Sequence, residues 1–223
     1  MQINEDVIAS IVAQVLKQVG QEAPSMTSSI LENNSGMTLT SGMTLTDGGI
    51  AQKGTNPKEV VIGIAPAFGK NMHYTIKKIP HSQVLREIIA GIEEEGCVAR
   101  IVRVLRTSDV GFIGNYAAKL AGSGIGIGVQ SKGTVVIEQK DMTPLNNLEL
   151  FPLAPLVTLQ IYRAIGRNAA KYAKGENPDP VPVALDITVL PIYQPMAVLL
   201  HNRETSDVVL NGDHVDVDLK FTN

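Results

Sequence analysis

The chain has 223 residues, enough to bury one sizeable hydrophobic core, and its formal net charge is -3, from 19 Lys and Arg against 22 Asp and Glu. Without a basic excess or a basic cluster, the composition disfavours a nucleic-acid partner. The absence of a long apolar run and of a secretory signal pattern predicts a cytoplasmic protein with no membrane partner, and the single cysteine, Cys97, excludes an internal disulfide.

Residues 1–20 place apolar side chains at helical spacing. These are Val7, Ile8, Ile11, Val12, Val15, Leu16 and Val19. We expect an amphipathic helix that docks on a partner, because a helix this short is marginally stable alone. A frayed terminus, or a helix that packs on its own domain, is the alternative.

Residues 21–57 change in composition to Ser, Thr, Gly and Asn, with no aromatic side chain. They contain the tandem SGMTLT at 35–40 and 41–46. Such a segment has little to bury, so it predicts a disordered linker between the N-terminal helix and the globular part.

Residues 58–183 alternate strand and helix patterns. Apolar runs predict strands and apolar stripes predict helices, at 59–65 (strand), 82–96 (helix), 98–105 (strand), 110–120 (helix), 122–128 and 134–137 (strands), and 158–174 (helix). This order predicts an α/β fold, a Rossmann-like parallel sheet with flanking helices. Ligands of such sheets bind beyond the carboxyl ends of the strands, where the loops at 65–69, 107–109 and 131–133 should meet.

Residues 184–223 follow the proline-rich NPDPVPV and have a different pattern. Short apolar or alternating runs at 197–200, 207–210 and 215–221 predict strands, and Asn211-Gly212 predicts a tight turn. We therefore expect a strand-rich extension that forms a C-terminal β-hairpin.

The stretch 121–155, AGSGIGIGVQSKGTVVIEQKDMTPLNNLELFPLAP, combines glycine-lined strands, one lysine and polar loop groups. Glycine occupies every second position from Gly122 to Gly128, so one face of a strand here would be bare backbone open to a flat ligand. Lys132 would lie beside that face. The alternative is that the glycines admit a packed helix and that Lys132 is a solvated loop charge.

Motif spacing excludes several self-contained active sites. The glycine run lacks the third glycine of the dinucleotide fingerprint and leads into a strand, and the chain has no phosphate-binding loop, nucleophile elbow or cysteine pair for a metal. The four histidines, His73, His81, His201 and His214, are scattered and are predicted to be surface or hydrogen-bonded core residues. We assign no catalytic residue and no metal ligand to this chain.

Several long segments agree with one family. They are EVVIGIAPAFG (59–69), IPHSQVLREIIAGIEEEG (79–96), ARIVRVLRTSDV (99–110), AGSGIGIGVQSKGTVVI (121–137), PLNNLELFPLAPL (144–156) and YRAIGRNAAKYAKGENPDPVPV (162–183). Together they resemble the medium (β) subunit of adenosylcobalamin-dependent diol and glycerol dehydratases.

The resemblance implies a heteromer with large and small subunits, a dimer of heterotrimers, that converts propane-1,2-diol or glycerol to the aldehyde plus water by a radical mechanism. Adenosylcobalamin would be shared with the large subunit, which would hold the substrate and any potassium or calcium. This chain would support the lower face of base-on cobalamin, since it lacks the Asp-x-His-x-x-Gly motif that replaces the base. Its N-terminal helix would recruit the enzyme to the shell or lumen of a bacterial microcompartment.

The resemblance also assigns cofactor contacts by matched motif. In TSDV, QSKG and PLNNLELFP they are Asp109, Ser131, Lys132, Gly133, Leu145, Asn147 and Pro152. Asp109 and Lys132 would meet polar groups on the lower side of the cofactor, and Leu145, Asn147 and Pro152 would line the benzimidazole and its tail. After PVPV the family usually carries an arginine and a lysine around a proline, whereas this chain has Leu190-Pro191-Ile192, so no contact is assigned beyond residue 183.

Two other functions fit parts of the pattern. One is the small subunit of the dehydratase-reactivating factor, which has a related fold but is expected to be shorter and to lack the QSKG and NNLELFP segments. The other is a non-catalytic scaffold or nucleotide-binding protein of the microcompartment. Co-elution with two other chains and cobalamin would favour the dehydratase.

Overall fold

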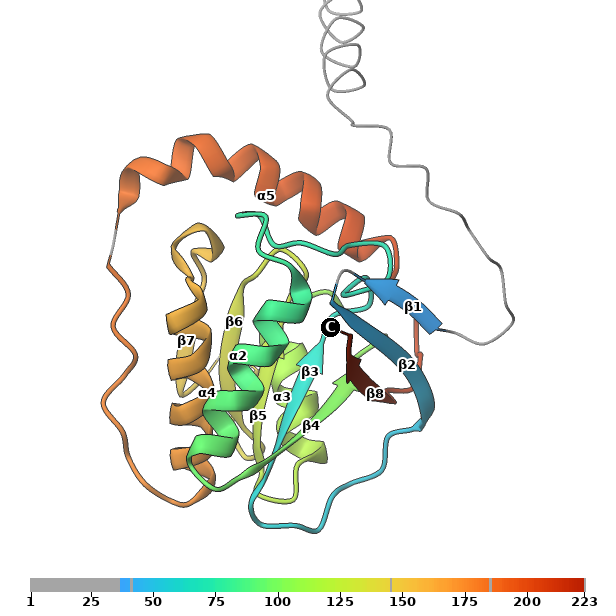
Figure 1. Cartoon of the computed structure of the whole chain (residues 1–223), viewed down its shortest axis with the longest axis vertical. Coiled ribbons are helices and arrows are strands. Elements are labelled where there is room, and N and C mark those ends of the chain that lie inside the picture. Colours follow the sequence, from blue (N-terminus) through green and yellow to red (C-terminus); the bar gives the residue numbers. More distant parts are fainter. Residues whose placement is uncertain (1–36, 41, 145, 185, 223) are drawn as a thin grey trace, which may run out of the picture. The chain divides into compact units, whose positions relative to one another are not determined.

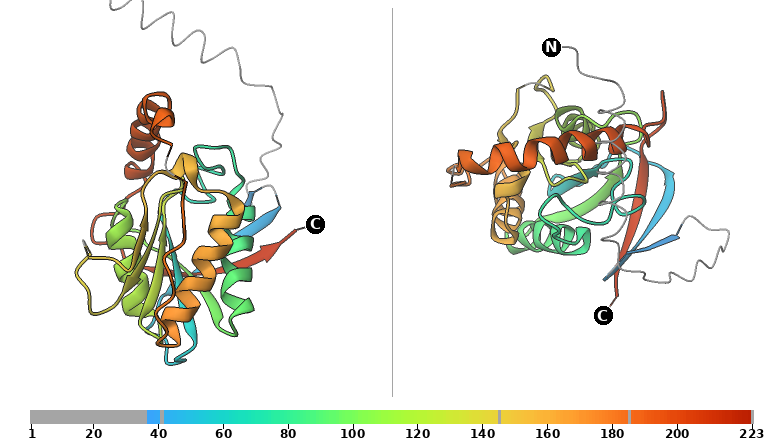
Figure 2. Two further views of the ribbon diagram at one scale, coloured as in Figure 1. Left: turned by 90° about the vertical axis from the view of Figure 1, so that its left-hand side faces the viewer. Right: turned by 90° about the horizontal axis from the view of Figure 1, so that it is seen from above.

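A computed structural model describes residues 37–40, 42–144, 146–184 and 186–222, which belong to one compact unit. Within them a mixed sheet has the strand order β1-β2-β8-β4-β3-β5-β6-β7. Helices α2 (His81–Glu94) and α4 (Leu159–Ala173) cover one face, and α3 (Val110–Leu120) covers the other (Figures 1 and 2). The predicted α/β class is confirmed, whereas the predicted N-terminal helix lies outside the described residues.

Only the central strands run parallel. The strands are β1 (Met37–Thr40), β2 (Met43–Ile50), β3 (Glu59–Ile64), β4 (Val98–Arg103), β5 (Ile125–Val129), β6 (Val135–Gln139), β7 (Glu149–Phe151) and β8 (Val215–Phe221). β3 pairs in parallel with β4 and β5, and every other pair in the sheet is antiparallel. The parallel pairing that was predicted is therefore limited to these three strands.

The core lies on both faces of β3. Val60, Ile62 and Ile64 pack in the large cluster on the α2 and α4 side, and Val61 packs in the smaller cluster with Ala117 of α3. All four β3 side chains have an exposed fraction of 0%. Each buried aliphatic side chain contributes about 1.5–3 kcal/mol, which explains why this run is apolar without alternation.

The tandem SGMTLT forms a β-hairpin. β1 and β2 pair so that Met37 lies opposite Thr46 and Thr40 opposite Met43, with Gly42 at a φ of 85° in the turn. Met43 and Leu45 are buried in the main core. The prediction of a disordered linker is therefore wrong for the described residues from 43 onwards, because pairing with the distant strand β8 buries apolar side chains that composition alone undervalued.

Asp47 distinguishes the two identical copies of the repeat. Its carboxylate accepts a hydrogen bond from Arg103 Nε at 3.0 Å and pairs with Lys70 Nζ at 2.6 Å. Burial raises the pKa of Asp47, but the two cations outweigh burial and hold the pKa below its ordinary value. Asp47 directly follows the second copy, whereas Ser41 follows the first. If the first copy took the place of the second in β2, Ser41 would stand where Asp47 is and Arg103 would lose its carboxylate partner.

The C-terminal segment does not form the predicted hairpin extension. Residues 197–200 lie in helix α5 (Leu190–Thr205), and residues 207–210 form no strand. Residues 215–221 are a strand as predicted, but this strand is β8 and inserts between β2 and β4 of the main sheet. Short apolar runs do not separate helix from strand, and the partners of β8 are distant in sequence.

Two short 3-10 helices complete the described elements. They are η1 (Ala154–Leu156), which precedes α4, and η2 (Ile187–Val189), which precedes α5. α5 crosses the sheet edge at which the parallel strands end (Figure 2). Among the described residues, no helix combines the length and apolar character needed to span a bilayer.

Arg103 is a fully buried cation at the end of β4. Its Nη1 donates hydrogen bonds to the carbonyl oxygens of Ala65 at 3.3 Å, Pro66 at 3.1 Å and Phe68 at 2.7 Å. Together with the ion pair to Asp47, these bonds join the loop after β3 to β4 and β2. Burial lowers the pKa of Arg103, and Asp47 offsets part of that effect.

We predict that Arg103→Met lowers the free energy of unfolding by about 3 kcal/mol or more, because it removes the hydrogen bonds to three buried carbonyl oxygens and one of the two cations that pair with Asp47. Urea denaturation followed by circular dichroism measures the change. Arg86→Met is the matched control, since Arg86 is exposed and lies over the Phe221 ring. Equal losses in the two variants would contradict the structural role of Arg103.

Glu138 is a buried acid on the α3 side of β6. Its exposed fraction is 0%, and neither carboxylate oxygen has a hydrogen-bond partner among the described residues. Burial raises the pKa of Glu138 from 4.5 to about 8. The folded protein therefore keeps a proton at neutral pH that the unfolded chain releases.

This difference predicts that the protein loses stability as the pH rises from about 4.5 towards about 8, since the unfolded state binds fewer protons in that range. Glu138→Gln removes the titration and should flatten the dependence of the melting temperature on pH, with the largest gain at the alkaline end. Thermal melts over a pH series measure it, with Glu176→Gln as an exposed control. Parallel pH profiles for wild type and Glu138→Gln would refute the assignment.

Candidate functional site

Three loops meet at the edge where the parallel strands end. The side-chain amide of Gln130 donates a hydrogen bond to the Ser108 carbonyl oxygen. The backbone N–H groups of Ala67 and Ser131 both donate to the Glu204 carboxylate, at 3.2 and 2.7 Å. The predicted convergence of the loops after β3, β4 and β5 is thus confirmed, and α5 supplies the group that connects two of them.

Glu204 is buried at the C-terminal end of α5, with an exposed fraction of 1%. Burial raises its pKa, while hydrogen bonds from Ser131 and Ala67 act in the opposite direction. The hydroxyl of Ser131 donates to Glu204 at 2.6 Å, in addition to the backbone N–H of the same residue. Both donors of Ser131 are therefore occupied inside the protein, so a hydrogen bond donated by this residue to a cofactor would have to displace Glu204.

His81 is a core histidine of the same edge. Its ring stacks on Phe68 with a centroid distance of 3.8 Å. Nδ1 accepts a hydrogen bond from the Gly69 N–H at 3.1 Å, so Nε2 donates to the Ser131 carbonyl oxygen at 2.8 Å. Burial lowers the pKa of His81 to about 3, which keeps the ring neutral. The prediction of a hydrogen-bonded core histidine is confirmed here.

The glycine face of β5 is not open to a ligand. A Cβ on Gly126 would collide with the backbone of Ala118, and a Cβ on Gly128 would collide with Gly114 and Val110. The glycines thus let α3 approach the sheet closely. The part of the alternative that concerns the glycines is confirmed, since they admit a packed helix, and the prediction of a bare ligand floor formed by these glycines is wrong.

A hollow of about 280 Å³ opens beside the hairpin turn that joins β5 to β6. Its walls come from the turn, the residues around η1, and α5. The lining residues are Ile76, Lys132, Thr134, Pro152, Leu153, Ala154, Pro155, Leu190, Tyr193, Gln194 and Ala197. The walls are largely apolar, and Lys132 is the one cation among them.

Lys132 is half-buried and forms no ion pair within 4.0 Å with any described carboxylate. Burial lowers its pKa, while the negative charges of Glu204 and Asp109 raise it. Beside it, the Thr134 hydroxyl is buried and has no hydrogen-bond partner in the described structure. A positive charge and an unsatisfied hydroxyl in an apolar hollow favour a ligand with an aromatic body and an anionic group.

The hollow unites only part of the predicted set. Lys132 and Pro152 both line it. Gly133 has a φ of 103° and carries a carbonyl oxygen that accepts from the Tyr162 hydroxyl at 3.0 Å. Asp109 caps α3 by accepting from the Phe112 N–H at 3.2 Å. Asn147 is half-buried and is not among the lining residues, and Leu145 lies outside the described residues.

Sequence reasoning missed the part of the hollow that α5 provides. Leu190, Tyr193 and Gln194 line the wall opposite Lys132. They fall in a segment that was expected to contain strands and to contribute no contacts. Thr134, two residues after Lys132, was also missed. Among the described residues that line the hollow, it is the one whose buried hydroxyl has no hydrogen-bond partner.

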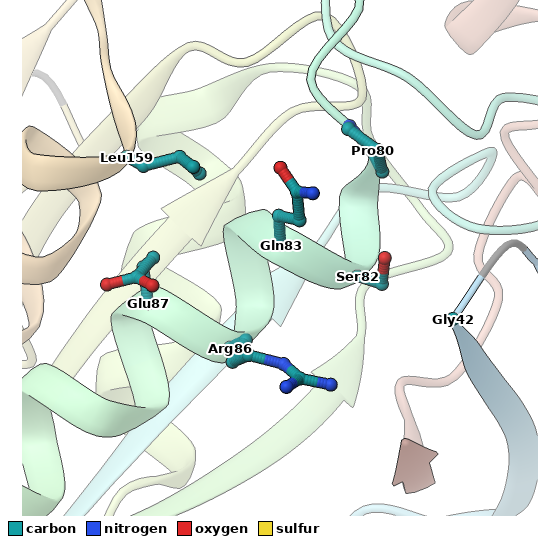
Figure 3. Close-up of a pocket in the computed structure, with 7 residues that line it drawn as sticks. All are labelled: Gly42, Pro80, Ser82, Gln83, Arg86, Glu87 and Leu159. Atoms are coloured by element: carbon teal, nitrogen blue, oxygen red, sulfur yellow. The ribbon is translucent and has the colours of Figure 1, made fainter. Parts of the chain in front are cut away.

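A separate hollow of about 510 Å³ lies at the start of α2 (Figure 3). It is lined by Gly42, Pro80, Ser82, Gln83, Arg86, Glu87 and Leu159. Its charged side chains already have partners, because Glu87 pairs with Arg163 at 3.0 Å and Arg86 lies over Phe221. None of the predicted contact residues lines it, so we take the Lys132 hollow as the candidate site.

Comparison with known families matches residues 65–179 to the model described as "Dehydratase medium subunit". Among solved structures, a "Glycerol dehydratase reactivase" is 17% identical, with a TM-score of 0.43 over 56% of this chain and 95% of that chain. A "diol dehydratase-reactivating factor complexed with ADP and Mg2+" is 24% identical, with a TM-score of 0.41 over 57% of this chain and 98% of that chain.

We predict that Glu204→Ala detaches the C-terminal part of α5 from the loops at Ala67 and Ser131, because Glu204 is the α5 side chain that bonds to both loops in the described structure. The backbone amides of α5 should exchange faster with deuterated water, and the free energy of unfolding should fall by about 2 kcal/mol. Hydrogen exchange with mass spectrometry measures the first effect. Glu176→Ala, on an exposed carboxylate, is the control; unchanged protection of α5 in Glu204→Ala would contradict the tether.

Proposed function

The chain belongs to the dehydratase medium subunit family, and we propose that it supports the lower face of base-on cobalamin in an adenosylcobalamin-dependent diol or glycerol dehydratase. Membership makes it a subunit of a dehydratase complex that works with other dehydratase subunits. The observation that carries the proposal is Lys132, a half-buried lysine without an ion-pair partner in the described structure, placed in an apolar hollow.

The residues of the hollow fit the nucleotide tail of cobalamin. Pro152, Pro155 and Leu190 supply apolar walls for a flat benzimidazole. Lys132 supplies a point charge with three donors for the phosphodiester, and Thr134 supplies an unsatisfied hydroxyl. Adenosylcobalamin, when bound, supplies radical chemistry through homolysis of its cobalt–carbon bond.

The role proposed for this chain is to bind and orient, not to react. Lys132 and Thr134 would fix the tail, and the edge loops joined by Glu204 would hold that turn in place. Substrate, and potassium or calcium, would be held by the large subunit. Closure of the interface between the two subunits would keep water away from the reactive face of the cofactor.

The surface of α5 supports a partner on this side of the protein. Ile192, Met196 and Leu199 are exposed to 74%, 48% and 63%. A helix that is apolar around much of its circumference is expected to be covered in an assembly. We propose that the large subunit covers α5, in a dimer of heterotrimers with the small subunit, and that residues 1–20 recruit the complex to a microcompartment.

We predict that Lys132→Met weakens retention of cobalamin by the assembled complex about tenfold, because the apolar stem remains and the charge is lost. The complex is co-expressed with its large and small subunits, and bound cobalamin is measured by absorbance after gel filtration. Lys140→Met, at the opposite end of β6, is the matched control. Normal retention in Lys132→Met would reject the proposed site, and co-elution of this chain with a reactivating-factor large subunit would support the alternative.

A further inference from the structure

A second hollow, of about 400 Å³, adjoins the Lys132 hollow. It is lined by Ile76, Lys77, Lys78, Ile192, Tyr193, Met196 and Leu200. Ile76 and Tyr193 line both hollows, so the two share a wall. α5 contributes only uncharged side chains to either lining, and the cations come from two loops, at Lys77 and Lys78 and at Lys132.

The two cationic loops are fixed to each other. The Ile76 N–H donates a hydrogen bond to the Lys132 carbonyl oxygen at 2.9 Å. The turn that carries Lys77 and Lys78 is closed by bonds from the Lys78 N–H to the Thr75 carbonyl oxygen, at 2.9 Å, and from the Thr75 N–H to the Ile79 carbonyl oxygen, at 2.9 Å. The backbone positions of Lys77, Lys78 and Lys132 are therefore set relative to one another.

Lys78 occupies a strained backbone conformation. Its φ is 61°, in the left-handed region that glycine adopts freely and side chains with a Cβ do not. Lys77 and Lys78 are exposed, and neither forms an ion pair within 4.0 Å with a described carboxylate. A lysine whose ammonium pairs with no described carboxylate, at a position suited to glycine, points to its charge as the reason for its presence.

We propose that Lys77 and Lys78 are additional anion-binding residues of this site, and that together with Lys132 they form a cationic rim for the phosphate group of a ligand lying across the Ile76 and Tyr193 wall. The inference rests on the proposed function, in which the phosphate belongs to the nucleotide tail of cobalamin. α5 has Leu190 and Ile192 at the two hollows and supplies no positive charge there. The proposal assigns that charge to Lys77 and Lys78 instead.

Lys78→Gly gives the sharpest test, because it relieves the backbone strain and removes the charge in one change. The variant should melt at a higher temperature than wild type and yet bind adenosylcobalamin about threefold to tenfold more weakly in the assembled complex at low salt. Lys77→Ala should weaken binding by a similar factor without the gain in stability. Lys53→Ala, an exposed lysine that lines neither hollow, is the control for net charge and should bind like wild type.

Two further comparisons identify the phosphate as the bound group. The difference between wild type and Lys78→Gly should shrink between about 20 and about 300 mM KCl, because salt screens exposed charges. Adenosylcobinamide, which lacks the phosphate and the base, should bind wild type and Lys78→Gly equally.

Lys78→Gly that binds adenosylcobalamin as tightly as wild type would overturn the rim while leaving the proposed function intact, provided that Lys132→Met still weakens binding. A wild-type complex that binds no cobalamin, or a Lys132→Met complex that binds it normally, would overturn the proposed function and the rim with it. Unequal binding of adenosylcobinamide would also count against a phosphate contact.

Discussion

The buried ion pair between Arg103 and Asp47 is the constraint on which the edge of the sheet depends. A charge with no exposure must be compensated inside the protein, and Arg103 is compensated by Asp47 on β2 at Nε and by carbonyl oxygens of the loop after β3 at Nη1. That loop then presents the Ala67 N–H to Glu204, which also holds Ser131. A chain of polar contacts thus runs from the N-terminal hairpin to α5 and to the turn that carries Lys132.

Local sequence patterns predicted the central part of the fold and failed where the partner strand is distant. The run at 59–65 is apolar because both faces of β3 are covered, and such a run predicts a strand without any knowledge of its neighbours. Residues 43–50 and 215–221 pair with each other across most of the chain, so neither segment alone reveals the burial that orders it. Residues 197–200 were predicted as a strand because a short apolar run does not separate helix from strand, and they lie in α5, where Pro191 falls in the first turn and is tolerated.

The candidate site was predicted in its position and only partly in its residues. The rule that loops meet beyond the carboxyl ends of parallel strands placed Lys132 correctly at the edge. The same rule does not tell which polar groups already form hydrogen bonds within the protein. In the structure, Ser131 bonds to Glu204 and Asp109 caps α3. The glycines of β5 illustrate the limit most clearly, because a bare backbone face serves a packed helix as well as it serves a ligand.

Polar groups that form hydrogen bonds within the fold are not available to a ligand. His81, Ser131 and Glu204 are saturated by one another and by the backbone, which makes the edge rigid and leaves it little to offer a ligand. The groups with free capacity lie one step further out, on the turn of Lys132 and Thr134 and on the turn of Lys77 and Lys78, and a backbone hydrogen bond from Ile76 to Lys132 joins the two turns. The hydrogen-bonded edge thus fixes the backbone of the turns that carry Lys77, Lys78 and Lys132. Such an arrangement is suited to holding an anion in a defined place, because lysine side chains that start from fixed backbone positions lose less conformational entropy when they bind it.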